Sequence, residues 1–140
     1  MKPLLQTGLS ASMEYQVPEV RTVPHLLPEA PEFAAMPHVL ATGYLVGLVE
    51  WTCMQALGGS LDDDERTVGV HVDLSHAAAS VPGSIVRFDV TLVEISRRQL
   101  TFSVRVTEQD GTVVCQGQHK RAVIDLPRFE ANLRNRTEST

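Results

Sequence analysis

The stretch that decides the fold is residues 39–57, which read VLATGYLVGLVEWTCMQAL. Apolar side chains recur on nearly every side of a helix drawn through it, a pattern typical of a helix packed over most of its circumference. Gly58 and Gly59 follow, and glycine is common where helices end. Gly43 and Gly47 lie one turn apart and leave bare backbone where another element can approach closely. The stretch therefore predicts one long, buried central helix.

Past Arg66 the spacing of apolar residues changes from the helical period of 3.6 to the strand period of 2. Long strands are predicted over residues 67–74, 86–92, 100–106 and 112–126. A short alternating run at residues 13–17 precedes the helix, and Gly117 is interpreted as a bulge in the last strand. One strand, one buried helix and four antiparallel strands form an α+β pattern in which a five-stranded sheet wraps the helix. The hotdog fold has this order of elements.

Between the first strand and the helix lies a proline-rich segment. Five of the eight prolines fall within residues 18–38, and proline at this density prevents a long helix or a central strand. Leu26, Phe33 and Met36 nevertheless make the segment too apolar for a free linker. We therefore expect residues 18–38 to form a folded cover, called the lid segment below.

The composition fits a single domain over residues 1–140. At 43% hydrophobic and 21% charged, the 140 residues suffice for one buried core. We expect residues 128–140 to form a C-terminal tail with a disordered end. Polar residues interrupt the longest apolar run, and Cys53 and Cys115 are too few for a disulfide scaffold, which favours a cytoplasmic protein without a membrane span. A net charge of −5 argues against nucleic acid as a partner.

Glu50 is the most unusual residue of the helical stretch, because a carboxylate among apolar neighbours is costly to desolvate unless it is paired or functional. A surface-facing glutamate is the alternative. His76 continues the even-numbered apolar face of residues 68–74, and if that face meets the helix, the imidazole reaches the helix side of the sheet. A structural histidine is its alternative. Both side chains are candidates for acid–base chemistry.

Thr42 and Gly69 are weaker candidates. Thr42 opens the helical stretch, where a hydroxyl caps a helix as readily as it serves catalysis. Gly69 is the only glycine in a β-branched strand; its N–H is a candidate donor to a substrate carbonyl, whereas a bulge or close packing explains it equally well. The remaining histidines, His25, His38 and His71, rank lower.

The sequence lacks the motifs of several common kinds of active site. The acidic residues 61–65 are expected to form a solvated loop, because an isolated acidic run is a poor metal site. The sequence has no glycine-rich phosphate loop, no His-x-x-x-His zinc pair and no Gly-x-Ser-x-Gly elbow. These absences argue against nucleotide hydrolysis, zinc chemistry and serine-hydrolase chemistry.

Four segments and one proline together resemble the fluoroacetyl-CoA thioesterase family of hotdog proteins. They are PEF at 31–33, Pro37, VLATGYLVGLVEW at 39–51, SHAA at 75–78 and HKRAVI at 119–124. The resemblance implies a homodimeric acyl-CoA thioesterase that hydrolyses a small acyl-CoA to free acid and coenzyme A. It implies no metal and no bound cofactor, since coenzyme A enters as part of the substrate.

The resemblance also implies roles for single residues. The positions that match the family's catalytic threonine, glutamate and histidine are Thr42, Glu50 and His76. Gly69 and Arg121 match positions around the acyl group. Phe33 matches a lid phenylalanine, but Met36 stands where the fluoroacetyl-specific enzyme has a second one, which puts selectivity for the fluorinated substrate in question.

Thioester hydrolysis needs a nucleophile or an activated water, and a donor to the developing oxyanion. Glu50 either attacks the carbonyl directly or acts as a general base on water, and the sequence does not separate these routes. A non-catalytic acyl-CoA-binding module and a dehydratase on the same fold are the alternative functions. Candidate cations for the coenzyme A phosphates are Lys120, Arg121, Arg97 and Arg98.

Thr42 and Glu50 are eight residues apart, which on one helix means about 12 Å along the axis and about 80° around it. Direct contact between them within one helix is therefore not expected. If both serve one site, either Thr42 precedes the helix or a partner subunit supplies one of the pair. The second arrangement favours a homodimer with sites at its interface.

Overall fold

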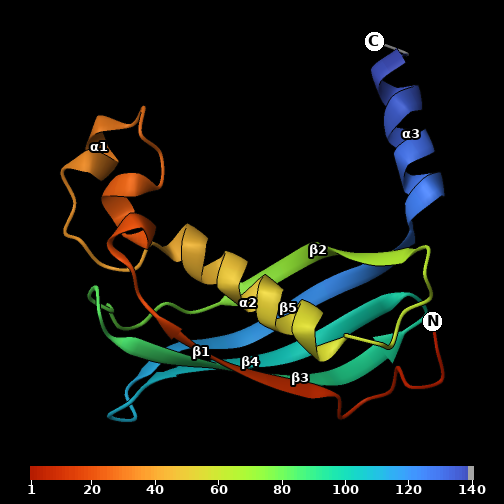
Figure 1. Cartoon of the computed structure of the whole chain (residues 1–140), viewed down its shortest axis with the longest axis horizontal. Helices are drawn as coiled ribbons and strands as arrows, with labels where there is room; N and C mark the ends of the chain where they lie inside the picture. The colour runs from red at the N-terminus through yellow and green to blue at the C-terminus, as the bar shows by residue number, and fades with distance from the viewer. Residues whose placement is uncertain (139–140) are drawn as a thin grey trace.

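The computed structural model describes residues 1–138 as a five-stranded antiparallel sheet with one long helix on one face (Figure 1). The strands are β1 (Ser10–Gln16), β2 (Glu65–Leu74), β3 (Ile85–Ser96), β4 (Gln99–Glu108) and β5 (Val113–Asp125). The helices are α1 (Pro31–Ala34), α2 (Thr42–Ala56) and α3 (Leu126–Glu138), with 3-10 turns η1 (Glu19–Arg21) and η2 (Val23–His25). The strand order β1-β3-β4-β5-β2 leaves β1 and β2 at the edges. This confirms the predicted hotdog fold.

Helix α2 is the predicted central helix, and it lies across the concave face of the sheet (Figure 1). Its buried residues are Leu45, Leu48, Val49, Thr52, Cys53 and Ala56. They pack against the buried apolar side chains of β3 and β4, among them Phe88 and Phe102. Trp51 and Met54, however, are 51% and 49% exposed. The helix is thus packed on its sheet side and open on another, rather than covered over most of its circumference.

A bulge in β2 changes which residues face the helix. The pairing of β2 with β5 shifts between Gly69 and His71, so Val70 is the extra residue. Before the bulge the buried position is the odd-numbered Thr67; after it, Val72 pairs with the buried His119. The predicted even-numbered inward face therefore holds only beyond the bulge. Val70 and Val72 are about half exposed on this edge strand.

Gly117 is not a bulge, contrary to the sequence interpretation, since it pairs in register with both Leu74 and Val104. Its φ is 149°, and a Cβ added there would lie 2.0 Å from the carbonyl oxygen of Asp73. Glycine is required at this position because the backbone of β2 approaches too closely for any side chain.

The lid segment packs at the N-terminal end of α2 (Figure 1). Its base is held by backbone hydrogen bonds of 2.9 Å from Val23 N–H to the Val39 carbonyl and 3.0 Å from Ala41 N–H to the Arg21 carbonyl. A Cβ on Gly43 would lie 3.2 Å from the Leu26 side chain, so this glycine lets the lid segment approach the helix. Gly47 has open space.

The C-terminal region is helical up to Glu138, so its described part is an α-helix rather than an extended tail. The expected disordered end includes residues 139–140, which lie outside the described residues. α3 buries no residue and projects away from the sheet (Figure 1). No helix within residues 1–138 has the length and apolar character to cross a membrane.

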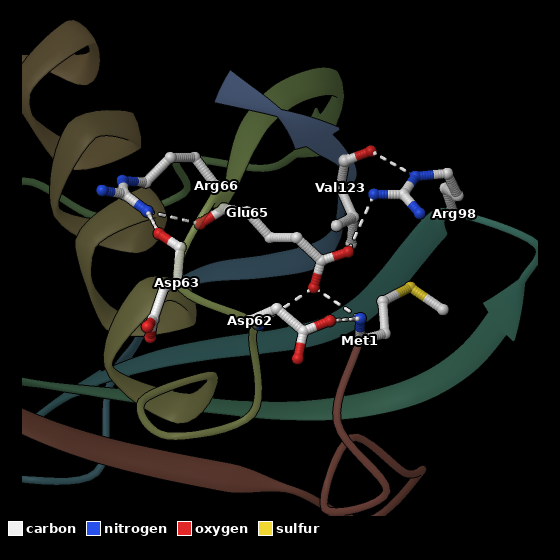
Figure 2. A network of polar contacts seen from close by, with 7 residues as sticks. All are labelled: Met1, Asp62, Asp63, Glu65, Arg66, Arg98 and Val123. Carbon is white, nitrogen blue, oxygen red and sulfur yellow. Dashed lines mark hydrogen bonds and ion pairs between the residues drawn. The ribbon is translucent and has the colours of Figure 1, made fainter. Parts of the chain in front are cut away.

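An ionic network ties the N-terminus to the loop after α2 and to the β3–β4 turn (Figure 2). The amino group of Met1 donates to Asp62 Oδ2 at 2.7 Å and pairs with Glu65. Arg98 donates to Glu65 Oε2 at 2.9 Å and to the Val123 carbonyl at 3.0 Å. Hydrogen bonds to the Glu65 carboxylate, the strongest from the Met1 amino group and the next from the Asp62 N–H, lower the pKa of Glu65 to about 2. The acidic stretch is thus only partly a solvated loop, because Glu65 is buried at the start of β2.

Candidate active site

Glu50 projects from α2 toward β5, where it forms an ion pair with Arg121. Glu50 Oε2 accepts a hydrogen bond of 2.9 Å from Arg121 Nη1. The Arg121 side chain is only 4% exposed, whereas that of Glu50 is 38% exposed. The glutamate is therefore neither buried alone nor a free surface residue. One end of its carboxylate is fixed by a buried cation while solvent still reaches the group.

Arg121 is held in turn by groups on β2 and β5. Its Nε donates to Thr67 Oγ1 at 2.8 Å and its Nη2 to the Thr67 carbonyl at 2.9 Å. His119 Nδ1 lies 2.9 Å from the His71 carbonyl, which can only accept, so the proton is on Nδ1 and Nε2 accepts from Arg121 Nη1 at 3.1 Å. Burial lowers the pKa of His119, which keeps this imidazole neutral.

Thr67 and His119 are site residues that sequence reasoning missed. His119 and Arg121 are two residues apart and buried on the same face of β5. Two polar residues at i and i+2 in an otherwise apolar strand face are the signal that would have found His119 beside Arg121.

Gly69 lies directly under the Glu50 carboxylate. A Cβ at this position would lie 2.6 Å from Glu50 Oε2 and 3.3 Å from His119 Cε1. Close packing thus explains the glycine, and the bulge begins at the same residue. A role for the Gly69 N–H as an oxyanion donor stays a prediction.

His76 and Thr42 form a second pair near the N-terminal end of α2. Thr42 Oγ1 lies 2.7 Å from His76 Nδ1, and the Thr42 side chain makes no helix-capping bond because Ala41 is the N-cap. The backbone beside His76 is fixed by hydrogen bonds from Ser75 and Ala77 to β5. Thr42 therefore orients the imidazole instead of capping its own helix.

The other ring nitrogen of His76 is buried and has no hydrogen-bond partner among the described residues. A buried polar atom left unpaired is costly, and such atoms mark places where a water, ligand or further protein group binds. Burial also lowers the pKa of His76 from its ordinary value of 6.5. The ring is therefore neutral near pH 7 and its free nitrogen is available for proton transfer.

The two pairs remain separate within one chain. No hydrogen bond or ion pair in residues 1–138 joins Glu50 to Thr42 or His76, and Thr42 is the first residue of α2, eight positions before Glu50. The structure thus assembles two halves of the expected site without bringing all three candidate catalytic residues together.

The other predicted residues have varied surroundings. Phe33 is half-buried in α1, and Met36 just after it is 49% exposed. Of the cations considered for coenzyme A phosphates, Arg121 is committed to Glu50 and Thr67, and Arg98 to Glu65. The remaining candidates are the exposed Arg97 in the β3–β4 turn and the half-buried Lys120 in β5.

Comparisons with known proteins place the chain in a class. The family described as fluoroacetyl-CoA-specific thioesterase matches residues 26–126. A fluoroacetyl-CoA thioesterase from Streptantibioticus cattleyicolor is 39% identical over 138 residues, covering 98% of each chain. A solved fluoroacetyl-CoA thioesterase superposes with a TM-score of 0.89 at 37% identity, covering 94% of this chain and 96% of the other.

A thioesterase superfamily member from Thermus thermophilus, 22% identical, superposes with a TM-score of 0.87 over 99% of this chain and 97% of the other, and so shares the fold. The fold and the matches define a hotdog-fold thioester hydrolase. The chain belongs to the fluoroacetyl-CoA-specific thioesterase family.

Replacing Gly69 with alanine should displace the Glu50 carboxylate. The added methyl group would meet Glu50 Oε2 at 2.6 Å, and the flexible side chain can move away, so the fold should persist. We expect kcat to fall by about 100-fold, the scale of losing one positioned acid–base group. In a double-mutant cycle, Gly69→Ala added to Glu50→Gln should cost little further activity; additive losses would show that Gly69 acts independently of Glu50.

The lowered pKa of His76 predicts the acid side of the pH–rate profile. If the neutral ring is the active form, kcat/KM should fall only as pH drops below 6.5, because burial disfavours the imidazolium. Titration of the His76 ring by NMR should give the same midpoint, and His76→Gln should abolish this limb. A midpoint at or above 6.5 would contradict the assignment.

Proposed function

We propose that the chain hydrolyses small acyl-CoA thioesters to the free acid and coenzyme A, with Glu50, His76 and Thr42 as its catalytic residues. The observation that carries the proposal is the buried, unpartnered Nε2 of His76, whose ring is held by Thr42 at Nδ1. The same fold fixes Glu50 through Arg121. The fluoroacetyl-CoA thioesterase relative, similar over 98% of both chains, acts on a compound of this class.

In the proposed reaction, the thioester carbonyl carbon gains an oxygen and loses the sulfur of coenzyme A. Along one route, Glu50 takes a proton from water while the water oxygen attacks the carbonyl. Along the other, Glu50 attacks directly and water then hydrolyses the mixed anhydride. In both, the neutral His76 ring first takes up a proton through its free nitrogen, from Glu50 along the first route and from the hydrolytic water along the second. It then gives this proton to the coenzyme A sulfur, which leaves as a thiolate. The Gly69 N–H is our candidate donor to the oxyanion.

Arg121 acts in this scheme as a positioning residue. The hydrogen bond from its guanidinium to Glu50 holds one carboxylate oxygen in place. The second oxygen is then left for water or substrate. These side chains supply the nucleophile, base and acid that hydrolysis needs, so we propose that no metal or bound cofactor takes part in the chemistry.

We further propose that the active unit is a homodimer in which Glu50 of one protomer meets His76 of its partner. The two separate half-sites support this arrangement, since each chain holds one of each. Two open surfaces support it as well: the outer edge of β2, with Val70 and Val72 about half exposed, and the uncovered side of α2 at Trp51. Large exposed apolar residues beside an open strand edge are typical of an association surface.

A cytoplasmic location is part of the proposal. Both cysteines, Cys53 and Cys115, are unpaired and buried. Burial raises the pKa of the Cys53 thiol to about 12 and that of Cys115 to about 11, so both are inert thiols that suit a reducing compartment.

A subunit-mixing experiment tests the residues and the dimer together, with release of free thiol from short acyl-CoAs as the assay. Glu50→Gln and His76→Gln should each lower turnover by at least about 100-fold. Random mixing after denaturation and refolding should restore about a quarter of wild-type activity, because half the dimers are mixed and each holds one intact site.

Mixing that restores no activity would contradict a site shared between protomers. Loss of folding is monitored by thermal melting, because Glu50→Gln leaves the buried Arg121 charge without its counter-ion. His76→Gln replaces a half-buried residue that pairs with no buried charge. Wild-type protein that binds acyl-CoA without releasing thiol would favour the non-catalytic module, and altered acyl chains with an intact thioester would favour the dehydratase.

Selectivity is predicted to depend on Met36. Fluorine is little larger than hydrogen, so a pocket cannot distinguish fluoroacetyl from acetyl by size. It needs either tight exclusion of water or an arrangement that exploits the altered polarity of the substrate. A rigid aromatic side chain closes the pocket, whereas the thioether of Met36 is flexible. We expect only a weak preference for fluoroacetyl-CoA, and an increased preference in Met36→Phe. The measurement is the ratio of kcat/KM for the two substrates. A large wild-type ratio that Met36→Phe leaves unchanged would show that this residue does not set selectivity.

A further inference from the structure

Three side chains of the lid segment converge on one point. Glu19 begins η1, His25 ends η2 and His38 lies between α1 and α2. Glu19 Oε2 is 2.8 Å from His25 Nε2 and 2.7 Å from His38 Nδ1. The carboxylate oxygen and the two ring nitrogens all lie within 4.8 Å of one another.

The carboxylate at the centre of this cluster is held by a buried residue. The hydroxyl of Thr22, a fully buried residue, lies 2.9 Å from Glu19 Oε2 and 2.7 Å from the Glu19 carbonyl oxygen, and its one proton is shared between these two acceptors. Thr22 is itself fixed by an isolated β-bridge to Leu40, beside the start of α2. Hydroxyl groups that orient a coordinating carboxylate in this way are typical of the surroundings of metal sites.

We propose that Glu19, His25 and His38 bind a divalent transition metal ion of the zinc class. Two imidazole nitrogens and one carboxylate oxygen form a ligand set that Zn²⁺ accepts, with water in the fourth position. The present N···O distances of 2.8 and 2.7 Å are those of hydrogen bonds. Tetrahedral bonds of about 2.0–2.1 Å place ligand atoms about 3.4 Å apart, so each ring nitrogen must move about 0.6 Å away from the carboxylate oxygen. All three side chains are 44–57% exposed, so an ion reaches them directly.

This site is distinct from the catalytic residues and was not indicated by the sequence. Its ligands are 6 and 13 residues apart, a spacing outside the usual zinc motifs, so neither the expectation of no metal nor the low rank given to His25 and His38 took it into account. The topology of the lid segment, with two 3-10 turns and α1, brings the three residues together.

A bound ion would join the start, the middle and the end of the lid segment. Phe33 and Met36 lie in the loop closed between His25 and His38. The His25 carbonyl accepts a hydrogen bond of 3.2 Å from Tyr44 on α2, which links the cluster to the helix. Resting on the proposed function, we infer that the metal stiffens the wall of the acyl pocket and so lowers KM without taking part in the chemistry.

Metal binding is tested on untagged full-length protein freed of metal with a chelator and dialysed. Zinc chloride is titrated in competition with a chromophoric chelator, and we expect one Zn²⁺ per chain. Glu19→Gln and His38→Gln should each weaken binding by at least about tenfold. Glu32→Gln is the matched control: it removes an exposed carboxylate of the same lid segment outside the cluster, and should bind as wild type does.

No measurable competition by the wild type, or equal affinity in Glu19→Gln and His38→Gln, would overturn the proposal. If Glu19→Gln fails to fold, the half-exposed His38 supplies the decisive variant. X-ray absorption of the zinc-loaded wild type should show two imidazole ligands, and a spectrum without them would overturn the site. In the hydrolysis assay, zinc should lower KM for wild type but not for Glu19→Gln. Absence of hydrolysis in all forms would refute the proposed function alone, because the titration needs no substrate.

Discussion

Arg121 places a positive charge inside the layer between sheet and helix, and such a charge is stable there only if its N–H groups find acceptors. With 3% of the residue exposed, water cannot serve. Glu50, Thr67 and His119 supply the acceptors, each at 3.1 Å or less. Removing one partner of a buried ion pair costs about 3–5 kcal/mol, a cost that solvent reduces here because Glu50 is partly exposed. Helix, β2 and β5 are therefore locked in one relative position.

The hydrogen bonds of Arg121 to Glu50, Thr67 and His119 account for features of the site that look unrelated in the sequence. The carboxylate must come so close to β2 that only glycine fits beneath it, which accounts for Gly69. His119 must present an acceptor to the guanidinium, so its proton has to lie on Nδ1, and the His71 carbonyl holds it there. The bulge at Val70 follows directly along β2, and beyond it the even-numbered residues, instead of the odd-numbered ones, face the helix. Without that one-residue shift, His76 would project from the wrong face of the sheet and could not meet Thr42.

Most of the fold could be predicted from the sequence, because its main signals are local. The apolar run of α2 and the alternation in β3, β4 and β5 each depend on neighbouring residues. The bulge in β2 was one of two explanations of Gly69, because the local sequence does not separate a bulge from close packing, and the structure shows both at this residue. The helical C-terminus after Leu126 was missed because its mixed, polar sequence has no buried face to give a pattern.

The sequence indicated part of the candidate site, but neither Thr67 and His119 nor the arrangement of the residues. Glu50 and His76 are conspicuous in the sequence because each is polar in apolar surroundings. The partner of Glu50 is less conspicuous, because Arg121 resembles any basic strand residue until its burial is known. The family resemblance placed Arg121 near the acyl group, and its charge also made it a candidate for phosphate binding. The cluster of Glu19 with His25 and His38 was hidden in the same way, since only the path of the proline-rich chain brings the three together.

The division between the rigid site and the lid segment follows from the kinds of contact in each. Around Glu50 the contacts are charged, buried and mutually dependent, so geometry there is fixed before any substrate arrives. The lid segment is held by a few backbone hydrogen bonds and by exposed polar groups, which solvent weakens. Proline limits how far such a segment can unfold, but it does not fix the side chains of Phe33 and Met36. The cluster of Glu19, His25 and His38 is therefore the interaction best placed to change the shape of the pocket. It does so without disturbing Glu50, Arg121 and the chemistry that they support.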